Sequence, residues 1–129
     1  MIITFATQKG GAGKTTLAIS FCNYLSGITE RQINVFDFDY QKSFYNKWKE
    51  DEDLAIPKLY EVEVIGEEEE KPFADFESLI GLKESEDINI FDLAGTLDEK
   101  YSDLLIYSDF IIIPFEYSDV SVKSTLVFK

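Results

Sequence analysis

The sequence of 129 residues predicts a three-layer α/β/α domain with a mainly parallel sheet. Two observations predict this fold class. Short apolar runs recur along the chain, and the segments between them have apolar residues at helical spacing. The runs are almost continuously apolar instead of alternating, which is typical of parallel strands covered by helices on both faces. Right-handed crossovers are then expected to connect the strands.

The front of the chain predicts a strand, a loop and a helix. Met1–Ala6 is a short apolar run, and a glycine-rich segment follows it directly. Helical spacing of apolar residues then continues over Thr15–Leu25, at Leu17, Ala18, Phe21 and Leu25. Gly27 stands where glycine commonly ends a helix, so we expect this helix to stop there.

Four further strands are predicted with different clarity. Ile33–Asp37 and Ile88–Asp92 read almost alike, because each has four mostly apolar residues followed by an aspartate. Phe110–Phe115 is a similar apolar run near the end of the sequence. Leu59–Ile65 alternates apolar residues with glutamate and predicts an added strand, whose place in the sheet the sequence leaves open.

Helices are expected between these strands. Phe44–Trp48 has the apolar face of a short helix, and a second helix is expected over Phe73–Ile80, entered through Pro72. A third covers Tyr101–Ser108, with acidic residues just before it, near the positive end of the helix dipole.

The composition excludes several classes of function. With a net charge of −13 and a pI of about 4.3, the chain is a poor nucleic-acid binder through bulk charge alone. Its single cysteine excludes an intramolecular disulfide, and the absence of histidine excludes histidine-dependent catalysis and histidine-ligated metal sites. No apolar run reaches the length of a membrane span, and the N-terminus lacks a signal-peptide pattern, so we expect a cytoplasmic protein.

Charge is distributed unevenly along the sequence. Residues 1–48 carry five basic and three acidic residues, whereas residues 49–129 carry seven basic and 22 acidic ones. The front third is therefore the region that favours phosphate. Two acidic runs, Glu50–Asp53 and Glu67–Glu70, are typical of solvated loops. An acidic surface for docking a partner is the other interpretation, and the sequence does not discriminate between them.

The strongest motif lies between the first strand and the first helix, and it reads Lys9-Gly10-Gly11-Ala12-Gly13-Lys14-Thr15-Thr16. Glycines let successive backbone N–H groups point at an anion, and the start of a helix adds partial positive charge. Lys14 would reach the β- and γ-phosphates of a nucleotide, and the Thr15 hydroxyl would bind Mg²⁺. A merely flexible glycine turn needs neither two lysines nor tandem threonines. We therefore expect residues 10–16 to bind a nucleotide.

This loop departs from the ordinary P-loop pattern in two ways. Gln8 stands where that pattern has its first glycine, and Lys9 adds a second lysine. Lys-Gly-Gly-x-Gly-Lys-Thr-Thr resembles the deviant Walker A motif of the ParA/MinD family, the plasmid-partition and septum-site ATPases. The resemblance implies that Lys9 crosses a nucleotide-sandwich dimer to the phosphates of the partner. The alternative is an exposed lysine that only raises the local potential.

Two aspartates stand at strand ends, where ligands of open α/β sheets bind. Asp37 and Asp92 each close an apolar strand, so they are candidates for holding a divalent ion. Alternatively, such an aspartate caps the following helix through its side chain. Combined with the glycine-rich loop, the matching placement of the two residues favours a role in binding.

The resemblance extends to these aspartates. Asp37-Phe38-Asp39-Tyr40-Gln41 is similar to the D-x-D-x-Q segment of the family, which implies that Asp37 supports Thr15 and the Mg²⁺ shell and that Asp39 positions the hydrolytic water. Asp92 is similar to the Walker B aspartate, which holds Mg²⁺ through water. The resemblance thus gives Lys9, Lys14 and Asp39 as catalytic residues and Thr15, Asp37 and Asp92 as metal-binding residues. Asp92–Thr96 looks like the switch region, without the prolines usual there.

The resemblance as a whole implies a single P-loop NTPase-like nucleotide-binding domain over residues 1–129, corresponding to the N-terminal portion of a ParA-like ATPase. Relatives are longer, so the sheet is expected to be incomplete relative to theirs, and the chain is interpreted as a fragment or a natural short form. The implied activity is slow, partner-stimulated ATP hydrolysis with Mg²⁺, coupled to formation of a homodimer. The implied role is segregation of plasmid, chromosomal or mobile-element DNA.

The implied partners follow the family. A ParB-like protein is expected to stimulate the ATPase, and nonspecific DNA is expected to bind only where additional C-terminal residues supply a basic surface. No membrane-binding amphipathic helix is expected. Two alternatives remain at this stage: a nucleotide-dependent dimerisation scaffold without hydrolysis, and a small-molecule ligase or kinase similar to dethiobiotin synthetase.

Overall fold

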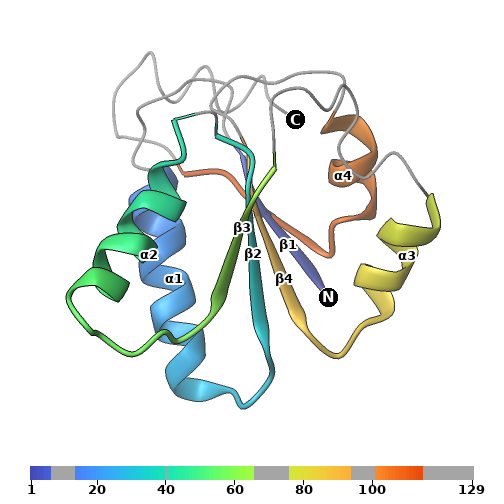
Figure 1. Cartoon of the computed structure of the whole chain (residues 1–129). Coiled ribbons are helices and arrows are strands. Elements are labelled where there is room, and N and C mark those ends of the chain that lie inside the picture. The colour runs from blue at the N-terminus through green and yellow to red at the C-terminus, as the bar shows by residue number, and fades with distance from the viewer. Residues whose placement is uncertain (7–13, 40, 66–75, 94–100, 115–129) are drawn as a thin grey trace.

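The computed structural model describes residues 1–6, 14–39, 41–65, 76–93 and 101–114 (Figure 1). The elements in chain order are β1 (Ile2–Phe5), α1 (Lys14–Ile28), β2 (Ile33–Asp37), α2 (Ser43–Asp53), β3 (Glu61–Val64), α3 (Phe76–Glu84), β4 (Ile88–Asp92), α4 (Ser102–Tyr107) and β5 (Phe110–Ile112). None of the helices in these ranges has the length and apolar content needed to cross a membrane.

The strands form one sheet in the order β3-β2-β4-β1-β5, and every pair of neighbours is parallel. The predicted α/β class with a mainly parallel sheet is therefore confirmed. The sheet also settles the place of the added strand, because β3 pairs with β2 at one edge. β4 lies between β1 and β2, which brings the ends of three strands together.

Helices cover the sheet on both sides. In Figure 1, α1 and α2 lie on one side of the strands, and α3 and α4 lie on the other. Each side has its own apolar core, and alternate residues of a strand contribute to each: Ile3 and Phe5 belong to the α1/α2 core, whereas Ile2 belongs to the α3/α4 core. Phe91 is fully buried in the second core, where its ring meets those of Phe36 and Phe38 edge to face, with centroids 5.4 and 5.7 Å apart.

The burial of the strands differs between the centre and the edges of the sheet. Every residue of β1 and β4 is buried, as the continuous apolar pattern predicts. In β5, however, Phe110 and Ile111 are exposed. The physical reason is position: among the described strands, β5 pairs only with β1, so one side of it has no neighbour.

Two helices begin close to their predicted positions. α2 starts at Ser43, one residue before the predicted apolar face. α3 starts at Phe76, so the predicted entry through Pro72 and Phe73 lies outside the described residues. Residues 115–129 lie outside them as well, which leaves the end of the last predicted strand undescribed.

Candidate functional site

β1, β2 and β4 all end on the same side of the molecule, and their carboxyl ends form the candidate site. This line of strand ends, called the carboxyl edge of the sheet, is distinct from the outer strands β3 and β5. Asp37 and Asp92 are the last residues of β2 and β4, and they stand directly opposite one another in the register. Phe5, the last residue of β1, stands opposite Asp92 on its other side. The chain that leaves β1 and enters α1 therefore starts next to Asp92.

Asp92 holds the start of α1 through two side chains. The ammonium of Lys14, the first residue of α1, donates a hydrogen bond to Oδ1 of Asp92. The hydroxyl of Thr15 donates to Oδ2 over 3.1 Å. Asp92 is completely buried and Lys14 is 7% exposed, so this ion pair lies almost entirely out of water.

The electrostatics of Asp92 follow from this burial. Loss of solvation raises the pKa of the Asp92 carboxyl, and the charge of Lys14, together with the hydrogen bonds from Lys14 and Thr15, opposes that rise. Removing one partner from a buried ion pair typically costs about 3–5 kcal/mol, because the other charge is left without compensation. The charges of Lys14 and Asp92 therefore compensate each other, unless another anion replaces the carboxylate as the partner of the Lys14 ammonium.

Asp37 is used differently, although it is equally buried. Its Oδ1 accepts the backbone N–H of Asp39 over 3.0 Å, and its Oδ2 accepts the N–H of Tyr45, the third residue of α2, also over 3.0 Å. Burial raises the pKa of Asp37, while these two N–H groups lower it and the charge of Asp92 raises it further. The carboxylate thus ties the end of β2 to the first turn of α2, as a helix cap does.

Asp39 lies in the connection between β2 and α2 and is half-buried. Its Oδ1 accepts the N–H of Gln41 over 3.0 Å, and its Oδ2 accepts the hydroxyl of Ser43 over 3.1 Å. One oxygen therefore has its partner in the connection and the other has its partner at the first residue of α2, and each keeps the capacity to accept a further hydrogen bond. The negative charge of Asp39 also raises the pKa of Asp92.

The donor set at this edge fits Mg²⁺ in chemical type. Hydroxyl and carboxylate oxygens are the ligands that this hard cation prefers, and Mg²⁺ usually keeps several waters while it binds one or two carboxylates and the phosphates of a nucleotide. Within the described ranges, no group of three or more His, Cys, Asp or Glu residues could hold a metal ion. The arrangement is therefore compatible with a metal that is bound together with a phosphate ligand, through Thr15 and Asp92.

Thiol chemistry is not expected here. Cys22 lies on α1 and is completely buried. Burial, and secondarily the charge of Asp92, raises the pKa of this thiol to about 12. Because the thiolate is the nucleophilic form, Cys22 is inert at neutral pH.

The structure brings together only part of the predicted site. Lys14, Thr15 and Asp92 are in direct contact, and Thr16 is exposed on the first turn of α1. Lys9 and Gly10–Gly13 lie in residues 7–13, outside the described part of the chain, as does Ala94–Thr96 of the predicted switch. The resemblance implied that Asp37 supports Thr15; in the structure, the contact with Thr15 comes from Asp92.

The sequence interpretation missed the pairing of Lys14 with Asp92, and it gave the role of Asp37 at the start of α2 only as the alternative to metal binding. The pairing of Lys14 with Asp92 follows from the order of the strands, because β4 is the neighbour of β1. A sequence alone does not give that order. The signal for the role of Asp37 was present, since an aspartate at a strand end commonly caps the next helix.

A family match covers most of the chain. The profile described as "CobQ/CobB/MinD/ParA nucleotide binding domain" matches residues 3–122. Among curated proteins, no sequence matches this chain significantly.

Solved structures of plasmid partition proteins share the fold. A partition protein from Borrelia burgdorferi, bound to AMPPNP, has a TM-score of 0.72 and 22% identity, and a further structure of a Borrelia burgdorferi partition protein has a TM-score of 0.72 and 24% identity. Each comparison covers 98% of this chain, but 66% and 69% of the respective structures. The pNOB8 ParA protein, bound to nonspecific DNA, has a TM-score of 0.75 and 18% identity, and the match covers 99% of this chain and 57% of that protein.

The hydrogen bonds of Asp37 generate a prediction on stability. Asp37→Ala leaves the partly buried N–H groups of Asp39 and Tyr45 without their acceptor, so we expect the free energy of unfolding to fall by about 1–3 kcal/mol in urea denaturation. Asp53→Ala, at the exposed last residue of α2, is the control and is expected to change it by less than about 0.5 kcal/mol. Unchanged stability of Asp37→Ala would contradict the capping role.

Proposed function

The chain belongs to the CobQ/CobB/MinD/ParA nucleotide-binding domain family, and from this premise we propose that it binds ATP with Mg²⁺ at the carboxyl edge of its sheet. The observation that carries the proposal is the contact of Lys14 and Thr15 with Asp92 at the start of α1. A buried ammonium and a hydroxyl stand there at a helix N-terminus, which is the arrangement that binds phosphate in P-loop proteins. One solved structure that shares the fold is bound to the ATP analogue AMPPNP.

Each side chain has a proposed role in this complex. Lys14 contacts the β- and γ-phosphates, and the backbone N–H groups of residues 10–16 surround them. Thr15 and Asp92 contribute oxygen ligands to Mg²⁺, directly or through water. When bound, Mg²⁺ neutralises charge on the phosphates. Asp37 is proposed to act at the metal through its contribution to the negative charge of this edge, because both of its oxygens already accept backbone N–H groups.

We propose further that residues 1–129 act as one nucleotide-binding domain whose ATP-bound form is a homodimer. Lys9 of each copy would reach the phosphates held by the other, and Asp39 would orient the attacking water. Phosphoryl transfer depends mainly on positioning and on neutralising charge, so a lysine supplied by the partner copy would couple hydrolysis to dimer formation. Slow hydrolysis by the isolated chain is the expected consequence.

The proposed biological role is DNA segregation. It is supported by the fold, which the chain shares with plasmid partition proteins, one of them bound to nonspecific DNA. The chain spans 66% and 57% of the length of those two proteins. Given its net charge of −13, DNA contact would require either a basic surface outside these 129 residues or the basic residues of the front third in a dimer. A ParB-like protein is the proposed stimulating partner.

One observation favours a second candidate, a nucleotide-dependent dimerisation scaffold that does not hydrolyse ATP. Both oxygens of Asp39 already accept hydrogen bonds, one from the N–H of Gln41 and one from the hydroxyl of Ser43. If these bonds persist with nucleotide bound, Asp39 is less able to orient a water molecule. Hydrolysis measured with and without DNA separates the two candidates.

The binding of nucleotide is predicted to depend on Lys14. Lys14→Ala removes the ammonium that contacts the phosphates, so we expect the affinity for Mg-ATP in isothermal titration calorimetry to fall by about 100-fold or more. Lys47→Ala, on the exposed face of α2, is the control and is expected to bind as the unchanged chain does.

Because Lys14 also compensates Asp92, the folded fraction of the Lys14→Ala protein has to be measured by circular dichroism in parallel. A folded Lys14→Ala protein that binds Mg-ATP with unchanged affinity would refute the proposed site.

Dimer formation is predicted to depend on Lys9. Lys9→Ala is expected to abolish the ATP-dependent increase in mass seen by size-exclusion chromatography with light scattering, because the contact with the partner's phosphates is lost. Binding of Mg-ATP by the monomer should persist. ATP-dependent dimers of the Lys9→Ala protein would remove the proposed role of this lysine across the dimer.

A further inference from the structure

Among the strands that the structure describes, β3 is the last strand at one side of the sheet, and β5 is the last strand at the other. Among the described residues, β3 pairs only with β2. The N–H of Ile65 donates to the carbonyl of Asp37 on β2, and in a parallel pair alternate residues bond to the neighbouring strand. The backbone groups of Val62 and Val64 therefore face away from β2. Such an edge is able to accept an added strand.

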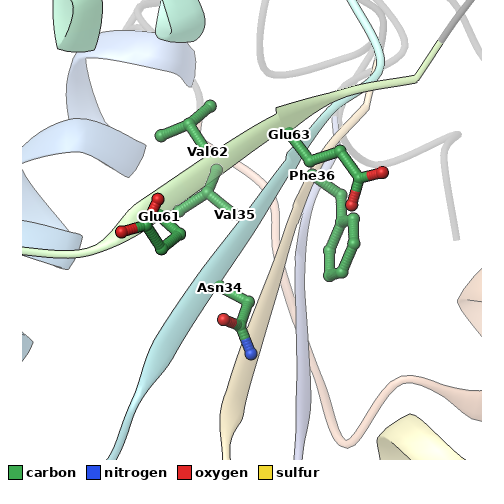
Figure 2. Close-up of a pocket in the computed structure, with 6 residues that line it drawn as sticks. All are labelled: Asn34, Val35, Phe36, Glu61, Val62 and Glu63. Carbon is green, nitrogen blue, oxygen red and sulfur yellow. The ribbon is translucent and has the colours of Figure 1, made fainter.

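A hollow lies along the same edge. It has a volume of about 300 Å³ and lies beside the middle of β2 and β3, lined by Asn34, Val35, Phe36, Glu61, Val62 and Glu63. Figure 2 shows Glu63 near Phe36 on one side of the strands, with Val62 on the opposite side of β3. Phe36 belongs to the α3/α4 core and stands opposite Glu63 in the register, so Glu63 points to the α3/α4 side of the sheet.

The charge at this edge is negative. Glu61 and Glu63 are exposed, and neither forms an ion pair with a lysine or arginine of the described residues. In the sequence, residues 59–70 contain six glutamates and no basic residue. An anionic partner is therefore repelled from this edge. A second copy pairing through β3 would bring the glutamates of two chains together, which destabilises a strand pair.

We propose that β3 and the adjoining hollow dock an extended segment of a partner protein that carries lysine or arginine at alternate positions. The segment adds to the sheet as a strand beside β3, using the outward backbone groups of Val62 and Val64. Its cationic side chains lie close to the carboxylates of Glu61 and Glu63. The surface is separate from Lys14 and Asp92, so this docking does not require the proposed nucleotide site.

The probe for this surface is a short fluorescent peptide of alternating lysine and threonine, measured by fluorescence anisotropy against the full chain. Glu61→Lys combined with Glu63→Lys is expected to weaken binding by about tenfold or more, because attraction becomes repulsion. Glu30→Lys combined with Asp53→Lys gives the same change in net charge at exposed positions that belong neither to β3 nor to the lining of the hollow, and it is expected to weaken binding by less than about threefold.

Two further comparisons separate strand addition from plain attraction between charges. A peptide with proline in place of threonine has the same charge but cannot pair as a strand, so we expect it to bind about tenfold more weakly. Glu61→Gln combined with Glu63→Gln avoids new charges and is expected to weaken binding of the lysine–threonine peptide while keeping the circular dichroism spectrum. Two results would overturn the proposal. One is an equal loss of peptide affinity in the variant changed at Glu61 and Glu63 and in the variant changed at Glu30 and Asp53. The other is equal affinity of the chain for the lysine–threonine peptide and the lysine–proline peptide.

Discussion

The arrangement of the candidate site depends on the compensation of one buried charge. Asp92 ends the central strand β4 without any exposure to solvent, and an isolated carboxylate in such a place is strongly disfavoured. Lys14 supplies the opposite charge and Thr15 supplies a hydrogen bond. Since both donors belong to the first turn of α1, this contact fixes where the helix begins relative to the sheet. A phosphate group at the start of α1 would offer Lys14 a second anion, and this is why the same residues are suited to binding a nucleotide.

The strand order determines which aspartate takes which task. β4 lies between β1 and β2, so Asp92 is next to the chain that enters α1, whereas Asp37 is one strand further away. Asp37 then accepts N–H groups of Asp39 and Tyr45 and holds the start of α2. Two aspartates that look equivalent in the sequence therefore have different surroundings. One is paired with a cation and the other is bound to backbone amides, although burial raises the pKa of both.

Much of the fold was predictable from the sequence, because continuous apolar runs report burial on both faces of a strand. This held for Ile88–Asp92, all of whose residues are buried. It did not hold for Phe110 and Ile111, since an apolar run does not reveal that a strand lies at an edge. The sequence also left open the place of the strand Glu61–Val64, because the pairing of strands distant in sequence is set by tertiary packing.

In the site, residue types and their spacing predicted Lys14, Thr15 and Asp92, but the partner of Thr15 required the strand order. The predicted roles of Lys9 and Asp39 stay predictions.

The most direct test of the central claim is the position of the Lys14 ammonium in a crystal structure of the chain with Mg²⁺ and AMPPNP. We expect Nζ of Lys14 at hydrogen-bond distance, about 2.7–3.2 Å, from an oxygen of the β- or γ-phosphate, with the metal beside Thr15 and Asp92. A nucleotide bound elsewhere on the chain, with Lys14 still held only by Asp92, would contradict it.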